Sequence, residues 1–361
     1  MNRRKEMSWG GGGRHLGRRW GLVLLGILGF AGACTPNSAS PDAQVEGLTA
    51  IPIAPPPPPA DWVPLVGEYA TSTDTLSVLE DGKRLYVLFW KGGGEALTPA
   101  TDSTFEMDRN GGTLTVRMAA GGRVGEVAVG SQAYQRLSLG AEEGGTFQIV
   151  PLRSAGELRE EALAAAPPVE EGDFLPSELV ELVGLDPTIH LDIRYASTNN
   201  FMGEVFYSSP RAFLQRPAAE AVARANEWLK ERGYGLLVHD GYRPWYVTKM
   251  FWDATPEALR NFVADPSTGS RHNRGCAVDL TLYDLKTGEV VVMPAGFDEM
   301  SPRSHADYPG GTSRQRWYRK LLRDAMEAQG FAVYSDEWWH FDYEDWRNYR
   351  IGNEGFAEIG G

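Results

Sequence analysis

The chain has little cysteine and little histidine, with two and six residues respectively among its 361. If Cys34 is modified, Cys276 is the only thiol left, so no intramolecular disulfide can form and stability must come from packed cores. The length allows such cores, and two globular units are expected. With 42% hydrophobic and 23% charged residues, the composition excludes both a disordered chain and an integral membrane protein.

Basic residues are also scarce, since 35 Lys and Arg stand against 48 Asp and Glu. Residues 1–33 hold six of the basic residues and one acid, so the remaining chain has 29 basic and 47 acidic residues and a formal charge of −18. This balance disfavours nucleic acid and anionic lipid surfaces as partners. It is compatible with small zwitterions or cations.

No apolar run suits a membrane span. The run at 20–33 is short, follows several arginines and ends in AGAC at Cys34, which is typical of an export signal. AGAC resembles a bacterial lipobox, which predicts a signal peptide at 1–33 and a lipid-modified Cys34; the alternative is a plain signal peptide. In both cases the protein is exported to the periplasm or cell envelope, and lipidation would anchor it to a membrane.

Two segments of different composition follow the predicted signal peptide. Residues 34–60 are polar and then proline-rich, with five prolines at 55–59, which predicts an extended tether. Residues 61–152 are predicted to form an accessory β domain, as a small antiparallel sheet or barrel. Its expected strands alternate in hydrophobicity between turn residues and cover 75–79, 85–90, 113–118 and 124–129.

Residues 153–170 are predicted to be a charged, alanine-rich connector, and 171–361 a second domain in which helices and strands alternate. Caps and periodicity predict two helices, at 217–232 and 313–329. Strands are expected at 235–240, 276–284 and 331–335.

The stretch SRHNRGCAVD, residues 270–279, is the first candidate for chemistry. On the predicted strand Asp279 lies on the face opposite Cys276. His272 and Asp279 alone would more often be structural. The run DEWWHFDY adds His340, and the resulting N, N, O set suits zinc with one position open for water.

Glu337, three residues before His340, is then available as a base for that water. On a regular strand, residues i and i+3 point to opposite faces. We therefore predict irregular backbone at Trp338 and Trp339; a regular strand would argue against Glu337 as the base.

The run HDGYRP, residues 239–244, supplies a cation after a predicted strand. The following proline keeps Arg243 out of the helical region, and a fixed guanidinium beside zinc would stabilise an oxyanion. Taken alone, the pattern is more often that of a surface arginine in a turn. His239 is predicted to support this turn by hydrogen bonding.

Taken together, LDIRYASTNNFMG, HDGYRP, SxHxxGxAxDLTLYD, FDEM and EWWH resemble the D-alanyl-D-alanine dipeptidases of the VanX type, within the wider set of zinc D,D-peptidases and lysostaphin-like enzymes. The resemblance covers about residues 170–350 and leaves out the lipobox, the tether and the β domain. It implies an α+β catalytic domain with a central, mainly antiparallel sheet flanked by helices.

The resemblance also implies roles for residues. One zinc ion would be bound by His272, Asp279 and His340, with Glu337 as general base and then acid. Arg243 matches the arginine that supports the transition state.

Three further residues match positions that hold the substrate in that family. Ser270 would lie near the substrate carboxylate, and Tyr195 and Asp298 would help to hold its ammonium. Because a longer substrate would bury an unpaired polar group, such a site favours free dipeptides such as D-Ala-D-Ala.

Two alternatives remain at this point. A zinc D,D- or L,D-carboxypeptidase acting on peptidoglycan stem peptides would lack a closed ammonium subsite, against which Asp298 and Tyr195 argue. A non-catalytic lipoprotein that binds cell-wall peptides would not need Glu337 beside a complete ligand set.

Overall fold

The computed structural model describes residues 53–109, 111–137 and 145–359. The predicted signal peptide and Cys34 lie outside these ranges. Within them, no helix combines the length and the apolar character needed to cross a bilayer. Buried apolar side chains form two separate clusters, one from Leu65 to Tyr134 and one from Ile149 to Ile359.

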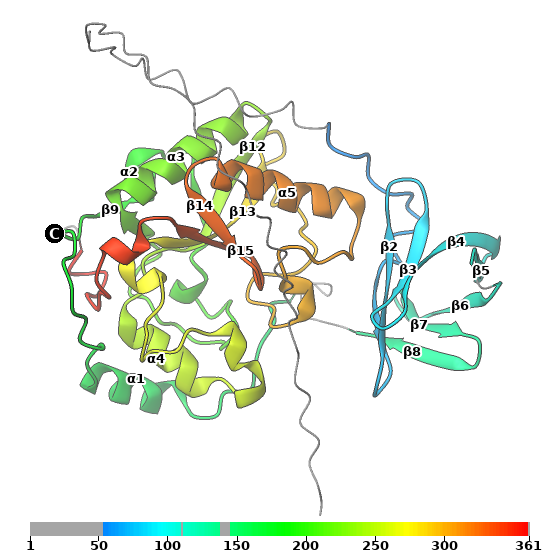
Figure 1. Cartoon of the computed structure of the whole chain (residues 1–361), viewed down its shortest axis with the longest axis horizontal. Helices are drawn as coiled ribbons and strands as arrows, with labels where there is room; N and C mark the ends of the chain where they lie inside the picture. Colours follow the sequence, from blue (N-terminus) through cyan, green and yellow to red (C-terminus); the bar gives the residue numbers. More distant parts are fainter. Residues whose placement is uncertain (1–52, 110, 138–144, 360–361) are drawn as a thin grey trace, which may run out of the picture. The chain divides into compact units, whose positions relative to one another are not determined.

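The first cluster is the interior of a closed antiparallel barrel, drawn in blue to green in Figure 1. Each strand pairs with the next, and β1 closes the barrel on β8. The four predicted strands are confirmed, and alternate residues such as Leu76 and Val78 face the interior. The strands are β1 Gly67–Ala70, β2 Thr75–Glu80, β3 Leu85–Phe89, β4 Gly93–Thr101, β5 Thr104–Met107, β6 Thr113–Met118, β7 Val124–Val129 and β8 Gln132–Arg136.

The second cluster surrounds a five-stranded sheet with the order β10-β12-β13-β15-β14. Only β10 and β12 are parallel; the other neighbours are antiparallel. A two-stranded sheet pairs β9 with β11. The strands are β9 Leu179–Glu181, β10 His190–Leu191, β11 Phe213–Gln215, β12 Tyr234–Asp240, β13 Ala277–Asp284, β14 Phe331–Tyr334 and β15 Glu337–Tyr343.

The described residues also form five α-helices: α1 Ala155–Ala164, α2 Leu182–Leu185, α3 Arg216–Lys230, α4 Trp245–Ala254 and α5 Ser313–Glu327. The two predicted helices are confirmed as α3 and α5. A proline lies in the first turn of α3, and Thr312 and Gln315 form a capping box at the start of α5. Helix α3 packs on β12 and on α5, which also packs on β14. Helix α1 lies within the segment predicted as a connector.

Strands β12, β13 and β15 lie side by side in the sheet, as Figure 1 shows, and they bring distant segments together. Asp279 on β13 lies opposite Asp240 on one side and His340 on the other. The register between β12 and β13 shifts between Val238 and Asp240. The centre of the sheet therefore gathers polar side chains from three segments of the chain.

Candidate metal centre and active site

Three predicted ligands meet near the start of β13. His272 Nε2, His340 Nδ1 and Asp279 Oδ1 form a triangle with sides of 3.1, 3.1 and 3.4 Å. All three residues are buried. Among the described residues, no other cluster of three or more His, Cys, Asp or Glu side chains could hold a metal ion.

The triangle has the size that zinc requires. Four ligands at about 2.0–2.1 Å in a tetrahedron lie roughly 3.3 Å from one another. Oδ1 of Asp279 is buried, and among the described residues no donor reaches it in hydrogen-bond geometry, although both imidazoles are near. Burial opposes ionisation of Asp279, but His272 and His340 hold the pKa of this carboxyl below its ordinary value. The three side chains thus fit a dication.

The other ring nitrogens fix which atom of each histidine faces the centre. Nδ1 of His272 lies 2.7 Å from the carbonyl oxygen of Gly241, which leaves Nε2 facing inward. Nε2 of His340 lies 2.9 Å from Oδ1 of Asp342, so Nδ1 faces inward. The two histidines therefore present different nitrogens.

Glu337 reaches the same centre because β15 pairs irregularly. In the pairing of β14 with β15, Val333 lies opposite Phe341, but the next residue, Tyr334, lies opposite Glu337. The register therefore shifts between these two pairs. The prediction of irregular backbone at Trp338 and Trp339 is thus confirmed. Oε2 of Glu337 lies 3.7 Å from Nδ1 of His340.

The surroundings of Glu337 suit proton transfer. Burial raises the pKa of this carboxyl to about 7, while His340 opposes the rise and Asp279 adds to it. A carboxyl with a pKa near neutrality can both accept and return a proton.

Arg243 is held by a buried carboxylate. Its Nε and one terminal nitrogen lie 2.9 and 2.8 Å from Oδ2 of Asp240, and the same terminal nitrogen lies 3.7 Å from Asp279. Oδ1 of Asp240 accepts a 2.7 Å hydrogen bond from Tyr207 and one from the Gly241 amide. Nδ1 of His239 instead lies 3.3 Å from the carbonyl oxygen of Asp192, so Asp240, and not His239, supports the turn.

All eight residues predicted from the sequence line a single cavity of about 110 Å³. They are Tyr195, Arg243, Ser270, His272, Asp279, Asp298, Glu337 and His340. Their side chains come from five separate segments of the chain. The cavity also has an apolar wall, which includes Phe201, Phe251 and Val263.

One end of this cavity carries a buried acid. Tyr195 donates a 2.8 Å hydrogen bond to Asp298. Burial raises the pKa of Asp298 well above its ordinary value, and the neighbouring Asp279 adds to this effect. Ser270 lies in the turn before His272, where its hydroxyl accepts the backbone N–H of that histidine at 3.2 Å.

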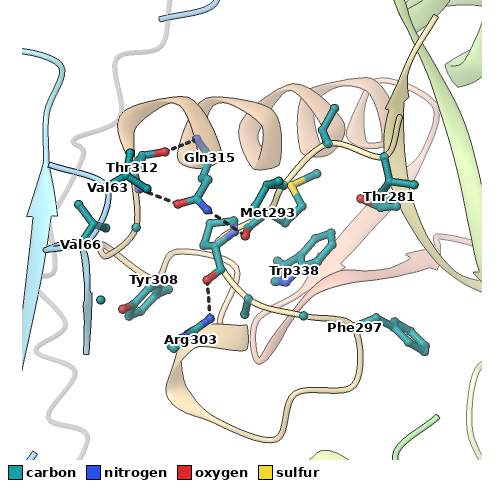
Figure 2. Close-up of a pocket in the computed structure, with 18 of the residues that line it drawn as sticks. Val63, Val66, Thr281, Met293, Phe297, Arg303, Tyr308, Thr312, Gln315 and Trp338 are labelled. Carbon is teal, nitrogen blue, oxygen red and sulfur yellow. Dashed lines mark hydrogen bonds between the residues drawn. The ribbon is translucent and has the colours of Figure 1, made fainter. Parts of the chain in front are cut away.

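A larger cavity, of about 520 Å³, adjoins this one. Figure 2 shows Thr281, Trp338 and Phe297 among the residues around it. Phe297 lines the larger cavity and its neighbour Asp298 the smaller one, so one segment separates the two. The ligand triangle lies in the smaller cavity, so the chemistry of the side chains rather than the volume identifies the site.

The residues that orient the site, above all Asp240 and Asp342, were not predicted from the sequence. Asp342 could have been predicted from its position. Residues i and i+2 of a strand share a face, and Asp342 lies two residues after His340. Asp240 lies three residues before Arg243, but no periodic pattern places its side chain beneath that guanidinium. Its role follows only from the bulge between β12 and β13.

Comparison with known proteins gives a consistent result. Residues 176–350 match the Peptidase_M15 family, described as D-ala-D-ala dipeptidase. The D-alanyl-D-alanine dipeptidase of Escherichia coli (strain K12) is 36% identical over 181 residues, which are 50% of this chain and 92% of that protein. Proteins of the same name from Enterococcus faecium and Streptomyces coelicolor are each 37% identical, over 45% and 44% of this chain and 90% and 87% of theirs.

Proposed function

We propose, since this chain belongs to the Peptidase_M15 family of D-Ala-D-Ala dipeptidases, that it hydrolyses the free dipeptide D-Ala-D-Ala with the help of one zinc ion. The chain is an enzyme of the dipeptidase class. The observation that carries the proposal is the triangle of His272, Asp279 and His340, with Glu337 3.7 Å from one of its corners.

His272, Asp279 and His340 would hold the zinc ion. A zinc ion held there would supply Lewis acidity, which polarises the peptide carbonyl and makes a water molecule easier to deprotonate. Glu337 then accepts the proton of the attacking water and delivers it to the leaving amine. The burial of Glu337 beside the ligand triangle supports its assignment to this transfer.

The protein itself contributes one fixed positive charge to the proposed reaction, the guanidinium of Arg243. Its guanidinium lines the cavity and is anchored to Asp240, so little reorganisation is needed as negative charge develops on the carbonyl oxygen. The ring of Tyr195 lies 5.1 Å from the same guanidinium. We therefore assign to Arg243 the role of stabilising the oxyanion.

The two ends of the cavity are proposed to bind the two ends of a zwitterion. An ammonium beside Asp298 would offset the burial that raises the pKa of this carboxyl. The backbone turn at Ser270 would face the carboxylate end. A cavity of about 110 Å³ leaves space for small side chains only, which favours alanine in both positions.

The test is release of free D-alanine from D-Ala-D-Ala by the purified protein, before and after removal and return of zinc. Glu337→Gln should lower kcat by about 10²- to 10⁴-fold while zinc remains bound. An N-acetylated substrate should be refused. Equal or faster cleavage of blocked or longer peptides would instead assign a carboxypeptidase, and a zinc-loaded protein that cleaves none of them would indicate a binding protein.

We further propose that the protein is exported and anchored by a lipid on Cys34. The support is the sequence AGAC after a basic segment and a short apolar run. Metabolic labelling with a fatty-acid analogue should mark the wild type and leave Cys34→Ala unlabelled. An unlabelled wild type would favour the plain signal peptide.

A further inference from the structure

The imidazole of His340 is engaged on both sides. Nδ1 faces the proposed zinc position, and Nε2 lies 2.9 Å from Oδ1 of Asp342. An imidazole that binds a metal through Nδ1 must carry its proton on Nε2. A carboxylate at hydrogen-bond distance from Nε2 accepts that proton and so selects this tautomer.

The strand geometry supports this contact. His340 and Asp342 are two residues apart on β15 and share a face of the strand. The residues opposite Asp342 on the two neighbouring strands are Ala277 and Ala332, neither of which has a polar side chain. The partners that β15 itself offers to the carboxylate of Asp342 are therefore side chains on the same face, such as His340.

Arg271 lies beside the second oxygen of the carboxylate. Its Nε lies 3.5 Å from Oδ2 of Asp342, and its guanidinium lies 5.0 Å from the ring centre of Trp346. The side chain of Asp342 is 15% exposed, so the contact to His340 is largely shielded from solvent. The 2.9 Å contact places this largely buried carboxylate as the acceptor for Nε2 of His340.

The two histidines differ in this respect. The second nitrogen of His272 contacts an uncharged backbone carbonyl, that of Gly241. Oδ2 of Asp240 lies 3.8 Å from the same nitrogen of His272, whereas Asp342 lies within hydrogen-bond distance of His340 at 2.9 Å. A carboxylate this close increases the electron density of the His340 ring and its strength as a ligand. Loss of Asp342 should therefore weaken the metal site more than its distance from the substrate suggests.

We propose that Asp342 is a positioning residue that fixes the Nε2–H tautomer of His340 and thereby sets the affinity of the site for zinc. The inference rests on the zinc site of the proposed function. It concerns metal binding in the absence of substrate, and it assigns no contact between Asp342 and the reacting atoms.

The experiment is a titration of the metal-free full chain with zinc in competition with a chromophoric chelator. Asp342→Ala should weaken zinc binding about 10- to 100-fold. Asp342→Asn keeps an oxygen that accepts the Nε2 proton, so it should recover most of this loss. Asp345→Asn, an exposed change just beyond the same strand, is the control.

Thermal unfolding of the metal-free proteins separates positioning from a structural role. Asp342→Ala should unfold at the temperature of the control while its zinc affinity is reduced. The proposal is overturned if its affinity stays within twofold of the control, or if Asp342→Asn binds zinc as weakly as Asp342→Ala. A wild type that binds zinc but cleaves no dipeptide would overturn the proposed function and leave this inference standing, whereas a wild type that binds no zinc would overturn both.

Discussion

The hydroxyl of Tyr195 donates a 2.8 Å hydrogen bond to Oδ2 of Asp298, across 103 positions of the chain. Asp298 has φ of 57°, a left-handed conformation that no other non-glycine residue shows in the described part of the chain. Such a conformation is costly and persists only where the surroundings enforce it. The turn therefore holds the carboxyl of Asp298 inside the cavity against a backbone preference.

Substitution of Asp298 should separate recognition of the ammonium from chemistry. Asp298→Asn removes the charge and keeps the size of the side chain, so KM for D-Ala-D-Ala should rise about 10- to 100-fold, the equivalent of a lost charge-assisted hydrogen bond. Steady-state kinetics would measure this, with the exposed Asp102→Asn as control. An unchanged KM would place the ammonium elsewhere.

Asp240→Asn should impair turnover without loss of zinc. The substitution removes the charge that holds Arg243, so we expect kcat to fall about 10- to 100-fold and the zinc content to stay at one per chain. Tyr207→Phe removes a single hydrogen bond to Asp240 and should have a smaller effect. If kcat of Asp240→Asn stayed within twofold of wild type, Arg243 would not depend on this anchor.

Gly241 leaves no room for a side chain. A Cβ at this position would lie 2.8 Å from the backbone oxygen of Phe213, so Gly241→Ala should lower the free energy of unfolding by about 1–3 kcal/mol. Urea denaturation of the metal-free protein would measure this. Gly156→Ala, where a Cβ meets nothing within 4 Å inside α1, should leave stability unchanged or slightly increase it.

Stability should also depend on pH through Asp186. Burial disfavours its charge, but hydrogen bonds from Thr188 and Asn226 lower the pKa of this carboxyl to about 2 from an ordinary 3.8. Because the folded pKa is the lower one, the stabilisation is complete above about pH 4 and is lost as the pH falls toward 2. Asp186→Asn should therefore cost about 1–2 kcal/mol at pH 7, with a difference from wild type that shrinks on acidification. A pH-independent difference, or an equal loss in the exposed Asp173→Asn, would contradict this origin.

The regular parts of the fold were predictable because they follow hydrophobic periods. The barrel strands at 75–79 and 113–118 alternate clearly, and each lies within one residue of its predicted ends. By contrast β4, which contains Gly93, Gly94 and Pro99, and the polar β8 lack the composition of strands. They form because closure of the barrel supplies partners on both sides.

The site was predictable only to the extent that its residues lie close in sequence or follow a family pattern. His272 and Asp279 are joined by a short turn into a strand, and Glu337 precedes His340 by three residues. Tyr195 and Asp298 came only from the family resemblance, because nothing local relates two residues 103 positions apart. The role of Asp240 could not be predicted, because it depends on the bulge in β12, and an alternating hydrophobic pattern does not predict a bulge.

The ligand triangle joins two segments that are far apart in the unfolded chain, since His272 and His340 are 68 positions apart. Zinc held as proposed would bind the folded chain in preference to the unfolded one, and each tenfold increase in free zinc above its dissociation constant should then add about 1.4 kcal/mol to the free energy of unfolding. The proportion of folded molecules would then follow the zinc supply of the compartment. Where the metal is scarce, the cell would lose the protein itself to proteolysis as well as its catalytic ion.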